Sequence, residues 1–247
     1  MTRLRIASHV HSQWSYDGRW TLEQISEAFG RRRYDAVLLA EHDRGFDARR
    51  WAQLRAACAA VNADGAGAHL VPGIEYSDPT NTVHIPVWGD IPFLGEGLDT
   101  ADLLAAAGTA GGIAVLAHPG RRDAGRRLDP ALLRQFTGIE IWNRKYDGYA
   151  PSRAAATLVR ATPGAIPMAS LDFHTPRQFH PLAMLVDLPG EATERDICAA
   201  LAARRARPAA FRLPATSLTR PPAWQTLRAI ELARKRVAKR LKPLLAH

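Results

Sequence analysis

Cysteine and long apolar runs are both scarce in this sequence. Its 247 residues include two cysteines, Cys58 and Cys198, and both lie in alanine-rich stretches with helical spacing. Their setting fits reduced packing side chains of a cytoplasmic protein better than a disulfide. No apolar run reaches the roughly 18 to 20 residues that span a bilayer. The charged start, residues 2–5, leads directly into a predicted strand rather than into a signal peptide. We therefore expect a cytoplasmic chain without a transmembrane segment.

The net charge of +9 is unevenly distributed. Residues 204–247 hold 12 lysines and arginines and a single acid, Glu231, whereas residues 1–203 hold 21 lysines and arginines and 23 acids. The body is thus slightly acidic, as suits a site for divalent cations. With 47% hydrophobic and 23% charged residues, the composition is that of a globular protein with one domain or a tight pair.

Short apolar runs alternate with helical patterns along the body. Strands are expected at 6–11, 34–40, 68–74, 82–88, 113–117, 138–142, 166–171 and 182–188. Helices are expected at 21–29, 47–62, 100–110, 130–136, 151–160 and 194–203. This alternation predicts parallel β/α units with right-handed crossovers. A barrel of such units gathers its functional residues at the carboxyl ends of the strands, and an open doubly wound sheet is the alternative.

Nine potential metal ligands lie at or near the ends of the predicted strands. They are His9, His11, Asp17, His42, Glu75, His84, His118, Asp172 and His174. His9 and His11 stand two residues apart, so on a strand their side chains share a face. Each residue alone could be an ordinary core histidine, helix cap or surface carboxylate. The set contains no cysteine, which excludes a structural zinc finger and favours a partly open hydrolytic site.

These motifs resemble those of the PHP (polymerase and histidinol phosphatase) family. The matching segments are HVHSQWSYDG, AEHDRG, PGIEYS, the histidine of NTVHIPVWGD, AHPGRR, GIEIWN and SLDFHT, which follow in family order from residue 9 to 174. The resemblance implies an α/β fold of the distorted (β/α)7 TIM-like barrel type, with two to three divalent ions. The long insertion of some nucleotide-cleaving members is absent from the sequence.

The resemblance also implies how the ligands are shared among the ions. His9, His11, Glu75 and Asp172 would hold the first ion. Glu75 would bridge to a second ion, which His84 and His118 would also hold. Asp17, His42 and His174 would hold the third. Nitrogen-rich sites suit zinc, manganese or iron, and the ligand types do not choose among them.

A phosphoesterase mechanism follows from such a site. A hydroxide held between two ions would attack phosphorus, and the third ion and nearby cations would bind the phosphate oxygens. Asp172, His174 and His11 are the expected catalytic residues. Cations that follow the ligands are candidates to bind phosphate, although each could be a solvated surface charge: Arg44, Arg121, Arg122, Arg144, Lys145 and Arg177. Trp14, Trp20 and the loop 142–149 could line the substrate pocket or pack beneath the loops.

The basic end of the chain predicts a second unit, 221–247, beside a catalytic barrel at 1–220. Its apolar positions recur at helical spacing at Trp224, Leu227, Ile230, Val237, Leu241 and Leu244, with basic residues between them. This amphipathic helix could pack on the barrel, or contact nucleic acid or an anionic membrane.

The leading hypothesis is a metal-dependent hydrolase that acts on a small-molecule phosphomonoester or small phosphodiester. The alternatives are an amide or lactone hydrolase of amidohydrolase type, a phosphotyrosine-protein phosphatase, and a non-catalytic interaction module stabilised by metal. No natural substrate or oligomeric state is predicted.

Overall fold

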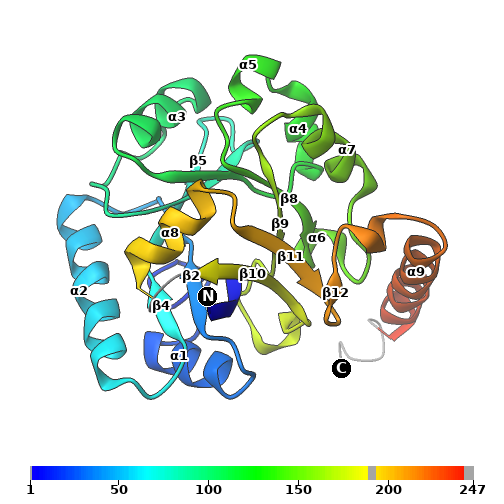
Figure 1. The fold of residues 1–247 in the computed structure, drawn as a ribbon, viewed down its shortest axis with the longest axis horizontal. Helices are drawn as coiled ribbons and strands as arrows, with labels where there is room; N and C mark the ends of the chain where they lie inside the picture. The colour runs from blue at the N-terminus through cyan, green and yellow to red at the C-terminus, as the bar shows by residue number, and fades with distance from the viewer. Residues whose placement is uncertain (1, 189–192, 242–247) are drawn as a thin grey trace.

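Twelve strands occur in the residues that the structure describes, a computed structural model covering 2–188 and 193–241. They are β1 (Thr2–Val10), β2 (Ala36–Leu39), β3 (Glu41–His42), β4 (His69–Val71), β5 (Gly73–Ser77), β6 (His84–Trp88), β7 (Ile113–Leu116), β8 (Gly138–Asn143), β9 (Ile166–Ser170), β10 (Leu182–Leu188), β11 (Ala206–Ala210) and β12 (Leu213–Pro214). They form two mixed sheets with the orders β12-β11-β10-β1-β2-β4 and β3-β5-β6-β7-β8-β9. The fold is therefore α/β, as predicted (Figure 1).

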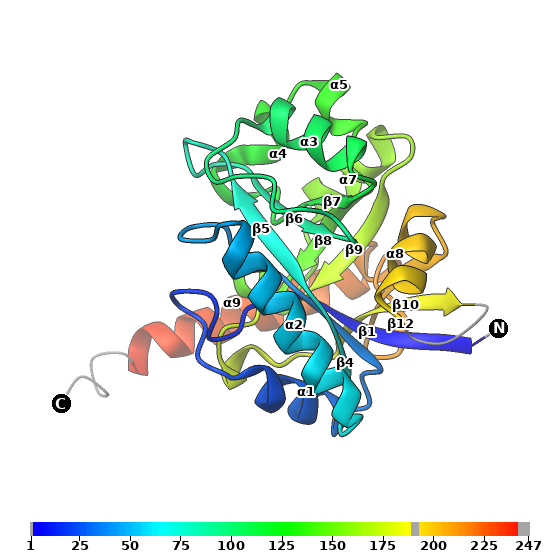
Figure 2. The ribbon, with the colours of Figure 1, turned by 90° about the vertical axis from the view of Figure 1, so that its left-hand side faces the viewer.

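Helices surround the sheets (Figures 1 and 2). They are α1 (Leu22–Gly30), α2 (Ala48–Asp64), α3 (Thr100–Thr109), α4 (Ala124–Arg127), α5 (Pro130–Leu133), α6 (Arg144–Asp147), α7 (Arg153–Ala161), α8 (Glu194–Ala202) and α9 (Ala223–Leu241). Local signals explain their starts. Thr21 and Gln24 form a reciprocal capping box at α1, and the Asp47 side chain accepts a hydrogen bond from the Arg50 amide at the start of α2.

The prediction of uniformly parallel units is wrong for part of each sheet. Parallel pairing holds for β1–β2–β4, for β3–β5 and for β7–β8–β9. However, β6 is antiparallel to both β5 and β7, and β10 is antiparallel to both β1 and β11. A short connection, residues 78–83, joins β5 to β6, and a parallel pair would need a crossover of a dozen residues or more.

The two sheets are joined beside the strand ends. Only Ala40 separates β2 from β3, and only Pro72 separates β4 from β5, so the chain passes directly from one sheet to the other. Elsewhere, the amide of Leu171 donates to the Ser8 carbonyl (3.1 Å) and the amide of His11 donates to the Phe173 carbonyl (2.9 Å). These bonds bring the segment after β9 against the end of β1.

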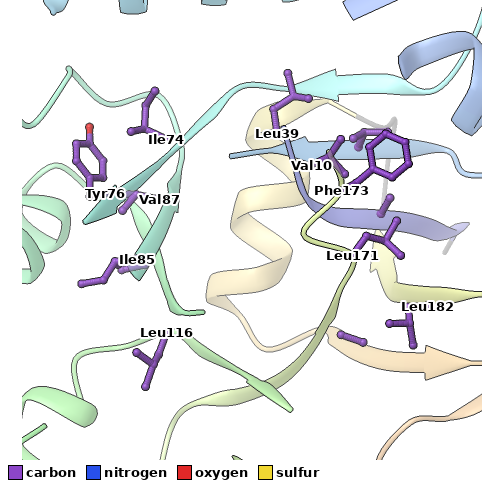
Figure 3. Packing of buried hydrophobic residues seen from close by; sticks show 14 of the residues in the cluster. Val10, Leu39, Ile74, Tyr76, Ile85, Val87, Leu116, Leu171, Phe173 and Leu182 are labelled. Atoms are coloured by element: carbon purple, nitrogen blue, oxygen red, sulfur yellow. The ribbon is translucent and has the colours of Figure 1, made fainter. Parts of the chain in front are cut away.

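Apolar side chains from both sheets pack beneath this junction (Figure 3). Val10, Leu39, Ile74, Leu116 and Leu171 are each at most 1% exposed. Burying a side chain of this size contributes about 1.5–3 kcal/mol relative to exposure. This core fixes the strand ends, and with them the polar residues that follow. Cys58 and Cys198 are both buried and free, as the sequence predicted.

The C-terminal helix α9 contacts the body through its first three turns. The Trp224 indole donates to the Pro151 carbonyl (3.0 Å), and the buried Glu231 carboxylate accepts from the Tyr149 amide (3.2 Å) and from Arg234. Residues 235–241 are exposed, and this end of α9 extends away from the sheets (Figure 2). The predicted helical positions beyond 241, including Leu244, lie outside the described residues. No helix that the structure describes is long and apolar enough to cross a membrane.

Glu231 should anchor α9 to the body. Burial raises the pKa of this carboxyl, but hydrogen bonds from Arg234 and Tyr149 outweigh burial and lower the pKa to about 2. The stabilisation is therefore present above the ordinary glutamate pKa and is lost as the pH falls towards 2. We expect Glu231→Gln to lower the free energy of unfolding by about 1–2 kcal/mol at neutral pH, and the difference from the wild type to shrink on acidification.

Thermal unfolding across pH and the rate of trypsin cleavage within α9 measure this effect. Glu27→Gln is the matched control, because Glu27 also pairs with an arginine but both side chains are more than half exposed. Equal effects of the two substitutions would show that Glu231 does not hold the helix.

Candidate metal centre

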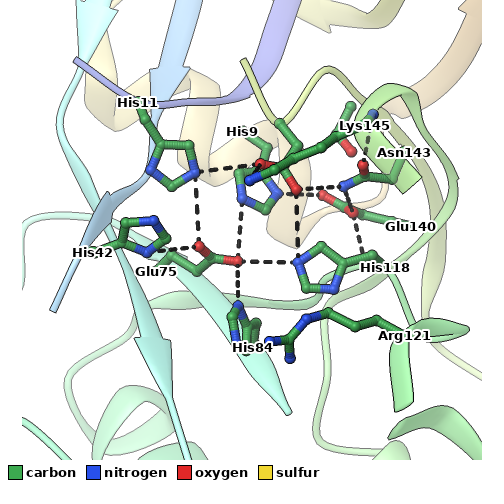
Figure 4. A network of polar contacts seen from close by, with 12 residues as sticks. His9, His11, His42, Glu75, His84, His118, Arg121, Glu140, Asn143 and Lys145 are labelled. Carbon is green, nitrogen blue, oxygen red and sulfur yellow. Dashed lines mark hydrogen bonds and ion pairs between the residues drawn. The ribbon is translucent and has the colours of Figure 1, made fainter. Parts of the chain in front are cut away.

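The carboxylate of Glu75, on β5, lies at the middle of a cluster of imidazoles and is 1% exposed (Figure 4). Five histidine rings from four different parts of the chain surround it. The closest nitrogen–oxygen distances are 3.2 Å to His9, 3.7 Å to His11, 3.1 Å to His42, 3.0 Å to His84 and 3.3 Å to His118. The strand ends therefore converge as the sequence predicted, with one carboxylate shared among them.

Two further carboxylates extend the cluster. Asp172 follows β9, and its Oδ1 lies 3.7 Å from His11 Nε2. Asp17, in the first loop, lies between two rings, 3.3 Å from His42 Nε2 and 3.1 Å from His174 Nε2. All nine predicted ligands thus lie at one end of the sheets.

Ligand atoms within 4.8 Å of one another define three overlapping groups. These are His11, Asp17, His42 and His174; His9, Glu75 and His118; and His9, His11 and Asp172. The first group contains the complete set expected for the third ion. The other two divide the set expected for the first ion between them. His84 belongs to none of the groups found among the described residues; its Nδ1 lies 3.0 Å from Glu75, and its Nε2 faces the Asn81 side-chain oxygen at 2.6 Å.

Several ring nitrogens at the centre of the cluster fit metal coordination. Within the described part of the chain, three buried ring nitrogens face carboxylate oxygens at 3.2–3.7 Å without forming a hydrogen bond: Nε2 of His9, His11 and His42. Leaving a buried polar group unsatisfied costs about 1–3 kcal/mol. Imidazole nitrogens beside carboxylate oxygens, without a thiolate, are a donor set for zinc, manganese or iron. The residues present therefore fit divalent cations.

Glu140, on β8, orients the His9 ring and holds the backbone of His118. Its Oε1 lies 2.8 Å from His9 Nδ1, and its Oε2 accepts hydrogen bonds from the His118 amide and the Asn143 side chain, both at 2.8 Å. Such a carboxylate fixes the ring orientation and directs the other nitrogen, Nε2, into the cluster. The sequence placed Glu140 at a strand end but did not assign it this contact.

Ser15 and Glu41 support His11 in the same way, and sequence reasoning missed both. The Ser15 hydroxyl lies 3.2 Å from His11 Nδ1 and 2.5 Å from Glu41 Oε2. The buried Glu41 carboxylate also accepts from the Ser12 amide (3.0 Å). The available signal was the run of polar residues at 41–43 after an apolar strand, but it does not indicate which of them turns inward.

The pKa values of the histidines diverge because their neighbours differ. Burial and the adjacent His42 and His174 hold the pKa of His11 well below its ordinary value. Burial would also lower the pKa of His42, but the adjacent carboxylates of Asp17 and Glu75 raise it to about 10. Since metals bind neutral imidazole, cation binding beside His42 would release a proton.

The backbone is strained at three of the predicted ligand positions. His9, His118 and Asp172 have φ angles of 61°, 27° and 48°, in a region that non-glycine residues rarely adopt. The β1–β2 register shifts at His9, between Ser8 and Val10. His9 and His11 therefore meet around a bulge rather than through regular strand alternation, which corrects the reason for their pairing. Strain of about 1–3 kcal/mol per residue is typical of functional sites.

The predicted phosphate-binding cations are placed differently from one another. Lys145 Nζ lies 3.2 Å from Asp172 Oδ1 and 3.3 Å from His174 Nε2, so it belongs to the cluster. Arg121 donates to the carbonyl and side chain of Asn81, whose oxygen faces His84. Arg122 donates to the same carbonyl and is exposed.

The other three cations lie farther out. Arg44 lines a cavity of about 270 Å³ beside His42 and His84. The guanidinium of Arg144 lies over the Tyr149 ring, 4.5 Å from its centroid. Arg177 is exposed, and no ion pair or hydrogen bond among the described residues joins it to the cluster. The structure thus brings Lys145 to the cluster but not Arg144 or Arg177.

The aromatic residues beside the cluster are tyrosines rather than the two tryptophans considered from the sequence. Tyr16 stacks on His42 with ring centroids 4.8 Å apart, and Tyr146 lies 4.4 Å from His118. Trp20 packs on Phe173 and Trp14 faces Phe46, so both tryptophans support the loop.

Comparisons with known proteins agree with this fold. No family model and no curated protein matches the sequence. Among solved structures, a two-domain protein from Bacteroides vulgatus that contains a predicted PHP-like metal-dependent phosphoesterase is 22% identical with a TM-score of 0.61, over 85% of this chain and 65% of that one. The lesion-specific endonuclease PfuEndoQ from Pyrococcus furiosus is 13% identical with a TM-score of 0.59, over 82% and 56% of the two chains.

A third similar structure is an amidohydrolase from Chromobacterium violaceum with bound sulfate and no metal. It is 20% identical with a TM-score of 0.54, over 81% of this chain and 96% of that one. This chain therefore spans less than two thirds of the first two proteins and nearly all of the third. At these identities the likeness shows a shared fold.

The contacts of Glu140 predict that it controls cation affinity. Glu140→Gln should weaken binding of a divalent cation by about 10- to 100-fold, because His9 and His118 lose their common carboxylate. Elemental analysis and chelator competition measure the change. Glu194→Gln is the control, since Glu194 is a partly buried carboxylate paired with Arg55 on a distant helix. Unchanged affinity in Glu140→Gln would contradict the assigned role.

Proposed function

We propose that the chain is a metal-dependent hydrolase, and specifically a phosphoesterase of PHP type that acts on a phosphomonoester or a small phosphodiester. The observation that carries this proposal is the set of three buried imidazole nitrogens, in the described part of the chain, that face shared carboxylates without a hydrogen bond. Lys145, beside Asp172 and His174, adds a cation where a phosphate oxygen could bind. The structural resemblance to a protein with a PHP-like phosphoesterase supports the same assignment.

The nine predicted ligands would hold two to three ions of zinc, manganese or iron. The three groups of ligand atoms support this number. When bound, such ions would lower the pKa of water to supply a hydroxide nucleophile and would neutralise charge on the phosphoryl group.

The chain's own residues would position the reactants. Asp172 lies within reach of the same space as Lys145, so it would accept a hydrogen bond from the attacking water, with His174 beside it, while the ammonium holds a phosphate oxygen. Arg121 and Arg44 would contact the substrate outside this point. We also propose that the bonds between residues 8–11 and 171–173 close a seven-unit TIM-like barrel.

A second candidate is hydrolysis of an amide or lactone, because an amidohydrolase shares the fold. Lys145 favours phosphate, since an anionic substrate benefits from a cation beside the carboxylates. Phosphotyrosine hydrolysis and a non-catalytic module stay alternatives. The endonuclease neighbour and the exposed basic end of α9 keep nucleic acid as a candidate partner.

Turnover should require both the cations and the residues that bind them. We expect phosphate release from para-nitrophenyl phosphate to stop after chelation and to return with zinc, manganese or iron. His11→Ala and Asp172→Ala should abolish it while the circular dichroism spectrum stays that of the wild type. A panel of esters, lactones and amides is the comparison. Faster turnover of these substrates, or full activity of the variants in excess metal, would contradict a phosphoesterase.

Lys145 lies in the cluster and Arg177 lies outside it, so comparing substitutions at the two positions tests whether Lys145 contacts the substrate. Lys145→Gln should raise KM or lower kcat/KM for a phosphate ester by about tenfold or more, the effect of losing one charged hydrogen bond of about 1.5–3 kcal/mol. Arg177→Gln is the matched control and should change kcat/KM little. Steady-state kinetics measure both. An equal loss in the two variants would exclude a specific contact between Lys145 and the substrate.

A further inference from the structure

A cavity of about 620 Å³ lies on the first sheet, away from the metal centre. It is lined by Arg5, on β1, whereas the ligand His9 stands four residues later on the same strand. At about 3.3 Å per residue, this separates the two positions by roughly 13 Å along the strand. The cavity is therefore distinct from the candidate metal centre, and its volume suits a small organic ligand.

Small apolar residues of two antiparallel strands form the floor. Ala183 on β10 faces Ala209 on β11 across the ladder, and Leu185 continues the same face. Two alanines opposite each other leave the sheet hollow here. The ring of Phe211, 45% exposed, forms one wall. An apolar body could thus bury its surface against this floor and ring.

Four arginines line the cavity around this apolar floor: Arg5, Arg32, Arg33 and Arg212. None of them belongs to an ion pair with a carboxylate within residues 2–188 and 193–241, and no acidic residue lines the cavity. Asp35 accepts the backbone amide of Arg5. The cavity therefore combines an apolar floor with uncompensated positive charge.

The half-buried Arg5 guanidinium is held in place before any ligand arrives. Its Nη1 donates to the carbonyls of Arg32 (2.6 Å) and Arg33 (3.3 Å), and the group stacks on the Tyr34 ring at 3.7 Å. Arg32 is fixed similarly over Phe179, at 3.8 Å. Preorganised cations lose little side-chain entropy on binding, which makes the site suited to a ligand rather than to a solvated surface.

We propose that this cavity binds an organic phosphate whose body is apolar or aromatic. Several guanidinium groups without a carboxylate partner match a dianion better than a single carboxylate, because each planar fork can donate two hydrogen bonds to phosphate oxygens. Phe211 and the floor of Ala183, Leu185 and Ala209 match the apolar part. A free metabolite and the headgroup region of a phosphatidate lipid share this chemistry.

The test uses benzylphosphonate, which carries both parts and contains no ester bond to hydrolyse. Isothermal titration of the metal-loaded protein should show two classes of site, one at the metal centre and one in this cavity, and binding to the cavity should weaken with salt. Arg33 and Arg212 both have positive φ, at 61° and 66°. Asparagine tolerates this conformation, so Arg33→Asn with Arg212→Asn removes charge without adding strain. We expect this double variant to bind at least about tenfold more weakly.

Arg204→Asn is the matched control, because Arg204 is an exposed arginine at φ 58° that does not line the cavity. It should bind as the wild type does, whereas the metal-centre variant His11→Ala should lose only the binding at the metal centre and keep that of the cavity. Phe211→Asn should weaken benzylphosphonate but not inorganic phosphate. Unchanged affinity in the double variant, or loss of all binding in His11→Ala, would overturn the proposal by assigning the phosphonate to the metal centre.

Two further measurements separate the sources of the ligand. Sedimentation with vesicles of phosphatidylcholine containing phosphatidic acid, lost in the double variant, would assign the site to a lipid. Benzylphosphonate binding without vesicle retention would assign it to a free metabolite. If neither vesicles nor benzylphosphonate bind, the cavity is not a phosphate site. Phosphatase activity should be unchanged in the double variant whatever the substrate, so this result is independent of the proposed function.

Discussion

The buried Glu75 carboxylate stays ionised only because imidazoles surround it, and much of the site serves to hold those imidazoles in place. A buried carboxylate loses its hydration, which by itself would raise its pKa. Interactions with His9 and His84 and hydrogen bonds with His118 and His42 instead hold the pKa of Glu75 well below its usual range. Because these histidines come from strands far apart in sequence, both sheets must be assembled before the carboxylate is compensated. The site therefore forms only when both sheets of the fold are in place.

The backbone carries part of the cost of this convergence. His9, His118 and Asp172 lie directly after or within buried strands, and all three adopt positive φ angles that an ordinary strand would not contain. The apolar core around Val10, Leu116 and Leu171 holds these residues in place. Glu140 and the Ser15–Glu41 pair then set the ring orientations. A rigid core, strained ligand positions and buried supporting carboxylates together produce a preorganised cluster.

Sequence reasoning located the residues of the cluster but not the contacts that orient them. Residues such as His118 and Asp172 follow continuous apolar runs, and strand ends of this kind converge whatever the loops do. The orientation of Glu41 depends on Ser12 and Ser15 from another segment, which no local pattern encodes. Arg144 and Lys145 are neighbours, yet one turns to Tyr149 and the other to Asp172, because helix α6 points consecutive side chains in different directions. The strand β6 was predicted, but its antiparallel direction was not, because the sequence pattern of a buried strand is the same in either direction.

Binding of divalent cations around Glu75 can be observed by anomalous X-ray diffraction from crystals of the metal-loaded protein, recorded at the absorption edges of zinc, iron and manganese. We expect strong anomalous peaks at coordination distance from the Glu75 carboxylate, with His9, His11 and His118 as ligands. Anomalous peaks elsewhere on the molecule, or a metal-loaded protein in which Glu75 contacts the histidines but no metal ion, would exclude this site.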